Sequence, residues 1–395
     1  MSAIPRGVWT LGLVSLCMDL SSELIHSVLP LYLALALGAS TLTIGIIEGV
    51  AEATALIVKM FSGMLSDMFR RRKPLVLLGY GLAALSKIIF PLAPGLGWVV
   101  TARFADRVGK DIRGAPRDAL IADIAPPGVR GASFGLRQAL DTVGAVIGPL
   151  FAVAAMAYFH SDFRATFWVA VVPAFIAVAL IVVGVEEPRR REARASAERV
   201  RIDLQAVRRL GSTYAIVVAI AAILTLARFS EAFLVLRAQN VGIAPASAPW
   251  VMVAMSLVYA AVAYPAGKAA DRGHGAMLLH GGLWALIAAD VVLAKADGPA
   301  LVYGGGALWG FHMGLTQGLL SAVVAASASP ALRGTAFGVF NLVSGVALLL
   351  ASAIAGWLWD AHGPATTFMV GAGLTFLAWL ALVTHRNAAR RLKTS

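Results

Sequence analysis

The sequence predicts an all-α integral membrane protein whose twelve transmembrane helices form two pseudo-symmetric six-helix halves. Three observations support this fold class: the chain is strongly apolar, its apolar runs have the length of membrane spans, and short fragments recur once between its halves. Of the 395 residues, 59% are hydrophobic and only 14% are charged, and the mean hydropathy is +0.80. Since a soluble domain carries about 25% charged residues, this composition indicates a chain that lies largely in lipid.

Twelve apolar runs are long enough to cross a bilayer, for which a helix needs about 20 mostly apolar residues. The runs are continuous and do not alternate with polar residues, which excludes a transmembrane β-barrel. They lie near residues 8–37, 42–65, 74–94, 97–122, 131–158, 165–185, 211–236, 248–267, 276–294, 299–327, 334–359 and 364–384.

One polar stretch, residues 186–210, separates the sixth run from the seventh and contains eight arginines. We therefore predict an N-terminal six-helix bundle over residues 1–185, a cytoplasmic linker over 186–210, and a C-terminal six-helix bundle over 211–395.

The basic residues predict the orientation of the spans. With both termini cytoplasmic, 21 of the 33 Lys and Arg residues fall in cytoplasmic segments, and the opposite loops hold only Arg164 and Lys295, with Arg237 at a helix end. Because cytoplasmic loops are enriched in Lys and Arg, we expect both termini on the cytoplasmic side of a bacterial inner membrane. The net charge of +12 lies in short loops rather than on one soluble face, so we expect no nucleic-acid partner.

The first apolar run contains Asp19 and Glu23 and lacks a small-x-small cleavage site, so we interpret it as a retained span and not as a signal peptide. The chain has a single cysteine, Cys17, which excludes an intramolecular disulfide and a cysteine metal cluster. We expect neither a metal nor a cofactor.

Three pairs of fragments recur between the halves with nearly the same offset, 203, 204 and 208 residues. They are RGASFGLRQ at 130–138 with RGTAFGVFN at 333–341, Gly63-x-x-x-Asp67 with Gly267-x-x-x-Asp271, and Ser22-Glu23 with Ser230-Glu231. A shared offset in three separate spans indicates a parallel duplication of a six-span unit, as transporter halves often show.

The loop after the second run, Gly63 to Lys73, resembles the G-x-L-x-D-R-x-G-R-[RK] loop of the major facilitator superfamily. It departs from that pattern at Met68 and Arg70, whereas the second copy keeps Asp271-Arg272-Gly273. The resemblance covers nearly the whole chain. It implies the fold of that superfamily, a small-molecule substrate, transport by alternating access, and a monomer in the lipid bilayer.

Two further motifs carry the same resemblance. In the fourth run Arg103 and Gly109 are similar to the family motif in which a central arginine is followed by glycines, although Arg107 and Asp111 replace small residues. In the fifth run Gly144-x-x-x-Gly148-Pro149 resembles the motif typical of proton-coupled antiporters, without its usual following glycine pair. We expect Gly144, Gly148 and Pro149 to act as a hinge.

Apart from the resemblance, the charges of this loop motif predict a physical role. An acid at the cytoplasmic end of a span can pair with a basic group or with a helix N-terminus of a neighbouring span and hold one conformation. Simple topology charge is the alternative interpretation. The predicted latch residues are Gly63, Asp67, Arg71, Arg72, Asp271 and Arg272.

Ionisable side chains inside spans are costly and therefore indicate function. In the first run Asp19, Ser22, Glu23 and His26 follow the i, i+3, i+4, i+7 spacing of one helix face. Two neighbouring carboxylates repel each other, so one of them is suited to hold a proton. The alternative is a polar face with a purely structural role. The predicted proton-coupling residues are Asp19, Glu23, His26, Glu48, Glu52, Arg103 and Asp106.

The fourth run is the most charged of all, and Arg103 and Arg107 within it need carboxylate partners, for which Asp19 and Glu23 are the natural candidates. Alternatively, this basic face binds an anionic substrate directly. In the fifth run Arg137 and Asp141 are spaced to satisfy each other. The predicted substrate-binding residues are Ser22, Arg107, Lys110, Arg137, Gln138, Asp141, Arg228, Glu231, Trp309, His312 and Gln317.

These features give a leading hypothesis and two alternatives. The leading hypothesis is a proton-coupled transporter that exports a small organic solute; it has no catalytic residue and is not an enzyme. The second hypothesis is a symporter or facilitator that imports an anionic metabolite or chelate, suggested by the basic fourth run. A membrane sensor or membrane-embedded enzyme is a remote third, because the longest soluble piece is the linker of about 25 residues.

Overall fold

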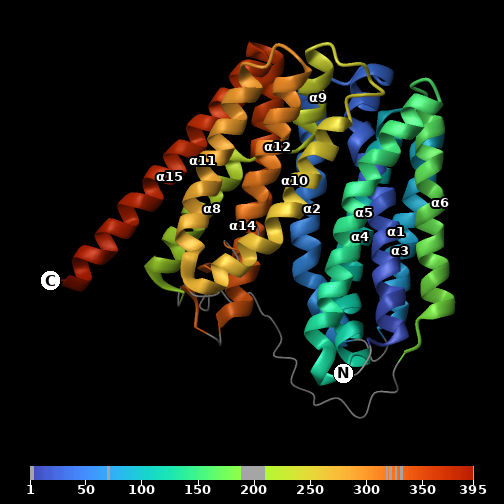
Figure 1. Cartoon of the computed structure of the whole chain (residues 1–395), viewed down its shortest axis with the longest axis horizontal. Helices are drawn as coiled ribbons and strands as arrows, with labels where there is room; N and C mark the ends of the chain where they lie inside the picture. The colour runs from blue at the N-terminus through green and yellow to red at the C-terminus, as the bar shows by residue number, and fades with distance from the viewer. Residues whose placement is uncertain are drawn as a thin grey trace. The chain divides into compact units, whose positions relative to one another are not determined.

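The computed structural model describes residues 4–68, 72–187, 210–316, 319, 323–324, 327–329 and 332–394. Within these residues the regular structure is helical throughout, and no strand is present. Figure 1 shows long helices with short connections. The all-helical fold class predicted from the apolar runs is therefore confirmed.

The chain packs as two compact units. One contains the described residues of Met1–Ala39, Val50–Val200 and Ala244–Trp250, and the other those of Ser40–Gly49, Arg201–Ile243 and Val251–Ser395. The second helix, α2 (Thr41–Met68), is thus divided between the units after Gly49. The predicted domain limits at residues 185 and 211 stay a prediction, and residues 188–209 of the predicted linker lie outside the described residues.

The first unit consists of the second part of α2 and five further long helices. They are α1 (Arg6–Leu31), which continues into a π-helical turn (Tyr32–Ala36), α3 (Lys73–Leu92), α4 (Leu96–Ile124), α5 (Arg130–Tyr158) and α6 (Phe163–Gly184), with a short 3₁₀ turn at Pro127–Val129. Asp162 begins α6 by accepting hydrogen bonds from the backbone N–H groups of Arg164 and Ala165, at 2.9 and 3.2 Å. Such an N-cap satisfies donors that a helix start leaves open.

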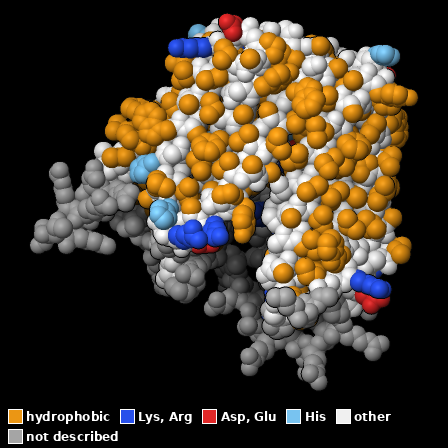
Figure 2. Space-filling view, in the orientation of Figure 1, with side chains coloured by type: hydrophobic (Ala, Val, Ile, Leu, Met, Phe, Trp, Pro, Cys, Tyr) orange, Lys and Arg blue, Asp and Glu red, His pale blue; other side chains and the backbone are white. Residues whose placement is uncertain are grey.

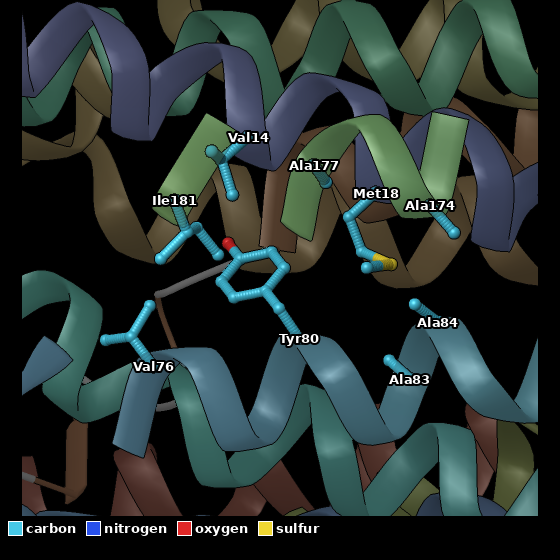
Figure 3. Close-up of a cluster of buried hydrophobic side chains, with 9 residues drawn as sticks. All are labelled: Val14, Met18, Val76, Tyr80, Ala83, Ala84, Ala174, Ala177 and Ile181. Carbon is cyan, nitrogen blue, oxygen red and sulfur yellow. The ribbon is translucent and has the colours of Figure 1, made fainter. Parts of the chain in front are cut away.

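The core of the first unit lies where α1, α3 and α6 meet. Small residues let the helices approach, and Tyr80 reaches from α3 into the space between α1 and α6 (Figure 3). Its neighbours there include Val14, Met18 and Ile181, all fully buried. The Tyr80 hydroxyl lies 3.4 Å from Ser15 Oγ, so this apolar cluster borders on the polar groups of α1 and α4.

The second unit contains the other helices. They are α8 (Gly211–Ala227), α9 (Ala232–Asn240), α10 (Trp250–Ala269), a π-helical turn (Ala270–His274), α11 (Gly275–Ala294), α12 (Pro299–Thr316), α14 (Arg333–His362) and α15 (Pro364–Thr394). Gly363, at a φ of 84°, ends α14, and Pro364 begins α15. Both residues suit their positions, because glycine readily adopts the left-handed conformation and proline is favoured in a first helical turn.

The seventh predicted span, near 211–236, is found as a candidate membrane span over Tyr214–Asn240, but its helix is interrupted. The chain leaves helical geometry at Arg228, with φ −107° and ψ 80°, and resumes it at Ala232. Two hydrogen bonds hold Ser230 within the break: its hydroxyl accepts from Ala232 N at 3.2 Å, and its own N–H donates to Ser352 Oγ at 3.2 Å. The sequence places three polar residues here, Arg228, Ser230 and Glu231, but the mean hydropathy of the run does not show that the helix is interrupted.

Nine helical stretches among the described residues are long and apolar enough to cross a membrane. One of them, Trp250–Ala294, has 45 residues and suffices for two crossings of a hydrocarbon core about 30 Å thick. The predicted spans near 97–122 and 299–327, which correspond to α4 and α12, are not among the nine. The prediction of twelve crossings is therefore supported only in part.

Large apolar side chains are exposed on many of these helices. Leu78, Leu85 and Val183 are 58%, 57% and 86% exposed, and Figure 2 shows apolar side chains spread over the helix flanks, with charged groups near the ends. A soluble protein seldom exposes such extensive apolar surface. The chain is thus an integral, multi-pass membrane protein.

Candidate functional site

The polar face predicted on the first span is present on α1. Ser22 and His26 are buried, at 6% and 7% exposure, whereas Asp19 and Glu23 are partly exposed. The helix is continuous from Arg6 to Leu31, so the i, i+3, i+4, i+7 spacing does bring the four side chains to one side. They face α3, α4 and α5 of the same unit, as the contacts below show.

A buried ion pair joins α3 to α4 and reaches α1. Lys87 Nζ lies 2.8 Å from Asp106 Oδ1 and donates to Ser22 Oγ at 3.0 Å. The side chains of Lys87 and Asp106 are 0% and 4% exposed. Charges so deeply buried persist only when they are paired and hydrogen-bonded, so this group of three fixes the positions of three helices at one point.

The two deep arginines of α4 have partners other than those favoured by the sequence. Arg107 Nη2 lies 2.6 Å from Glu52 Oε1 of α2, and Arg103 Nη2 lies 2.8 Å from His26 Nδ1. Glu23 stays within the electrostatic range of both arginines without a close ion pair. Because a guanidinium has no acceptor, the bond to Arg103 requires that His26 Nδ1 carry no proton.

Two carboxyl groups meet across α1 and α5. The side chains of Asp19 and Asp141 are hydrogen-bonded to each other. Ionised carboxylates only accept hydrogen bonds, so such a bond needs one proton between the two groups. Lys110 of α4 acts electrostatically on Asp19 and also on Glu23.

Basic side chains surround this pair of carboxyl groups. Arg137 Nη1 lies 3.3 Å from Asp141 Oδ2, which confirms the i, i+4 pair predicted on the fifth span, and Arg137 also donates to Gln138 Oε1 at 2.8 Å. Arg117 Nη1 lies 4.0 Å from Asp141 Oδ1 and donates to Ser15 Oγ at 3.0 Å. Arg137 and Arg117 thus both lie within 4.0 Å of the Asp141 carboxyl group.

The glycines of the predicted hinge let α5 approach α1 at this site. A Cβ added at Gly144 would lie 2.6 Å from Leu16 O, and one at Gly148 would lie 2.7 Å from Glu23 Cβ and 2.9 Å from Leu20 O. Pro149, the third predicted hinge residue, lies buried inside α5. The glycines thus hold the backbone of α5 directly against the turns of α1 that carry the acids.

Replacing Gly148 by alanine is expected to destabilise the protein by about 1–3 kcal/mol, because overpacking against backbone atoms cannot be relieved by a side-chain rotation. The melting temperature of the purified protein in detergent measures this effect. Gly135→Ala on the same helix is the matched control, since a Cβ there meets no atom within 4 Å. Equal melting temperatures for the two variants would contradict the close approach of α1 and α5.

The remaining predicted coupling residue, Glu48, is buried at 1% exposure and belongs to the second unit, whereas Glu52 belongs to the first. In that second unit Trp309 is fully buried, and its ring centroid lies 5.5 Å from that of Phe229. His312 is buried, with Nδ1 2.8 Å from Gly282 O.

Three other predicted substrate-binding residues are placed differently or not at all. Arg228 is exposed and Glu231 is partly buried, and both lie in the break between α8 and α9. Gln317 lies outside the described residues. The structure therefore brings the predicted residues of α1, α2, α4 and α5 together, but places the C-terminal candidates in a separate unit.

The predicted latch is only partly visible. The backbone of α2 includes Gly63 and Asp67, but Arg71 and the side chain of Asp67 lie outside the described part of the chain. Arg72 Nη1 lies 2.6 Å from Asp123 Oδ2, so α3 is tied to the end of α4 at this loop. In the second copy Asp271 and Arg272 are exposed, and no ion pair of either is found among the described residues.

Sequence reasoning missed Lys87 and Asp290, two buried ionisable residues in otherwise apolar runs. The signal was available, because an isolated charge within a span is a functional candidate by default. Within the described residues, no group of three or more His, Cys, Asp or Glu side chains is placed to hold a metal ion.

The comparisons with known proteins agree with this architecture. The family model of the Major Facilitator Superfamily matches residues 11–236 and 213–395. An uncharacterized MFS-type transporter of Methanocaldococcus jannaschii is 30% identical over 392 residues, covering 96% of this chain and 95% of that protein. An uncharacterized protein of Mycobacterium tuberculosis is 32% identical over 360 residues, covering 90% of this chain and 87% of that protein.

Solved structures share the fold at low sequence identity. A transporter of the POT family has a TM-score of 0.78 at 12% identity, covering 97% of this chain and 96% of that one. The nucleoside transporter NupG has a TM-score of 0.76 at 14% identity, covering 96% of this chain and 99% of that one. The human organic anion transporter MFSD10 has a TM-score of 0.63 at 18% identity, covering 97% of this chain and 100% of that one. With the helical units, the buried charges and the family match together, this chain belongs to the Major Facilitator Superfamily of transporters.

Proposed function

We propose that this transporter is proton-coupled, that it moves a small organic solute across a bacterial cytoplasmic membrane by alternating access, and that both of its termini are cytoplasmic. The observation that supports proton coupling most directly is the bond between the Asp19 and Asp141 carboxyl groups, which requires a bound proton. The proton and the solute are its only ligands in this proposal, and the protein acts as a monomer without a cofactor.

Coupling follows from the basic groups around this pair. A solute that approaches Asp19 or displaces Lys110 from it changes the charge balance that retains the proton, so solute binding and proton release are linked. His26 adds a second response, because protonating Nδ1 would remove its bond to Arg103. Both responses act on α1, which also contacts α5 through the two glycines.

Export is the favoured direction. Its support is the Gly144-x-x-x-Gly148-Pro149 motif, which resembles that of proton-coupled antiporters and lies directly against Asp19 and Glu23. The second candidate function is uptake of an organic anion. It is favoured by the basic side chains of α4, and one structural neighbour is named as an organic anion transporter.

A thermal-shift panel at two pH values tests this choice with purified protein in detergent. We expect lipophilic cations to raise the melting temperature, and to do so more strongly at the higher pH, because a cation that displaces a proton binds better when protons are scarce. Asp19→Asn should remove that pH dependence, whereas Asp297→Asn, an exposed acid in the second unit, should keep it. Stabilisation by organic anions alone, lost in Arg103→Gln, would replace the leading proposal by the second candidate.

A further inference from the structure

Asp290 is the most deeply buried acid among the described residues of the second unit. It lies on α11 with 0% exposure, and neither carboxyl oxygen has a hydrogen-bond partner among the described residues. The neighbouring elements carry His312 of α12, which is bonded to Gly282 O, and Arg228 in the helix break, which is exposed; among the described residues neither forms an ion pair with Asp290. On α15 the residue close to Asp290 is Gly371.

The internal repeat identifies the residue of the N-terminal half that corresponds to Asp290. Lys87 precedes Asp290 by 203 residues, the same offset that relates residues 130–138 to 333–341. In the first unit Lys87 pairs with Asp106, whereas the position 203 residues after Asp106 is Trp309, whose buried indole N–H finds no hydrogen-bond partner in the described part of the chain. The second unit therefore replaces a buried ion pair by an acid without a basic partner.

The carboxyl group of Asp290 lies close to the backbone of Gly371. A Cβ added at Gly371 of α15 would lie 2.8 Å from Asp290 Oδ2, 3.1 Å from Phe229 Cε1 and 3.4 Å from Ala227 O. The acid thus lies against α15 and against the end of α8, where the broken span begins. An ionised carboxylate at such a place, with no counter-ion and no donor, would carry a large desolvation cost.

We propose that Asp290 binds a proton in this conformation, and that it is a second proton site of the transporter, separate from the Asp19–Asp141 pair. The neutral acid lets α11, α15 and the end of α8 pack together. Loss of the proton requires water or a donor to reach Asp290, and therefore requires the break between α8 and α9 to move away from α11 and α15. The second proton site is thus coupled to the geometry of the broken span.

Infrared spectroscopy of the full-length protein in lipid nanodiscs tests this proposal at neutral pH. The difference spectrum between the unaltered protein and Asp290→Asn should show the loss of one protonated carboxyl C=O stretch, which shifts in D₂O. The matched control Asp297→Asn, in an exposed position, should show the loss of a carboxylate band instead. Gly371→Ala leaves Asp290 in place but puts a methyl group too close to its Oδ2 atom. The protonated carboxyl band of Asp290 should therefore shift in frequency in this variant.

Two results would overturn the proposal. One is the loss of a carboxylate band in Asp290→Asn, which would mean that Asp290 is ionised; if that band required sodium and disappeared in choline, the site would bind a cation and not a proton. The other is a protonated carboxyl band that neither Asp290→Asn nor Gly371→Ala alters. Either failure is distinct from a failure of the Asp19–Asp141 coupling, because that coupling is read from the pH dependence of ligand binding and from transport driven by a pH gradient.

Discussion

Replacing Lys87 by methionine is expected to destabilise the protein by about 3–5 kcal/mol, because Asp106 then remains buried without its counter-ion. Methionine preserves most of the side-chain length and volume, so the loss reports on the charge and not on a cavity. The Ser22 hydroxyl loses its donor in the same step, and with it one link between α1 and α3. The expected result is a melting temperature well below that of every surface variant.

The double variant Lys87→Met, Asp106→Leu separates charge from packing. Removing both members of a buried ion pair is often close to neutral when the replacements fill the same volume, so a large part of the lost stability should return. Lys59→Met is the control, since this lysine of the same unit is exposed and its loss should change stability by no more than about 0.5 kcal/mol.

The measurement is thermal unfolding of each variant in the same detergent, followed by tryptophan fluorescence. A double variant that melts at the temperature of Lys87→Met would show that Asp106 is not stabilised by Lys87. In that case the three-helix junction would depend on the apolar contacts of α1, α3 and α6.

The fold could be predicted because the features that determine it can be read along the sequence. Long apolar runs, the positions of basic residues and a repeated offset require no knowledge of which helix touches which. The break at Arg228–Glu231 coincides with three polar residues that the sequence does show, but the sequence does not show the hydrogen bonds of Ser230 with Ala232 and with Ser352 that accompany it. Helical periodicity alone does not reveal such a tertiary contact.

For the candidate site, the sequence likewise predicted contacts within one helix but not contacts between helices. The face of α1 with Asp19 and Glu23 follows from periodicity within one helix, and so does the Arg137–Asp141 pair. Partners on different helices do not, because they depend on how each helix is rotated about its own axis. Hence Arg107 pairs with Glu52 and not with an acid of α1, and Asp141 reaches Asp19 as well as its neighbour on α5.

Asp141→Asn and Asp19→Asn are each expected to abolish proton-driven transport while leaving solute exchange in place. A coupling free energy of about 1–3 kcal/mol means that a bound proton changes the affinity for the solute by about 5- to 150-fold. The variants should lose this effect. Asparagine preserves the shape of the acid and can donate a hydrogen bond to the remaining carboxylate. The variant therefore resembles the protonated pair but cannot release the proton.

Proteoliposomes loaded with the ligand found by the thermal-shift panel provide the measurement. Accumulation driven by a pH gradient should fall by on the order of tenfold or more in both variants, and counterflow exchange without a gradient should change by less than about threefold. Asp297→Asn, with the same chemical change at an exposed position, should retain both activities.

The ratio of the two activities distinguishes coupling from binding. If exchange and gradient-driven transport decline together, the Asp19–Asp141 pair binds the solute itself, which favours a substrate that contacts α1 directly. If both activities survive in these variants but the gradient-driven one is lost in Asp290→Asn, the coupling proton is bound in the second unit. A selective loss in Asp19→Asn and Asp141→Asn would assign the coupling proton to the junction of α1 and α5, where these two carboxyl groups are hydrogen-bonded to each other.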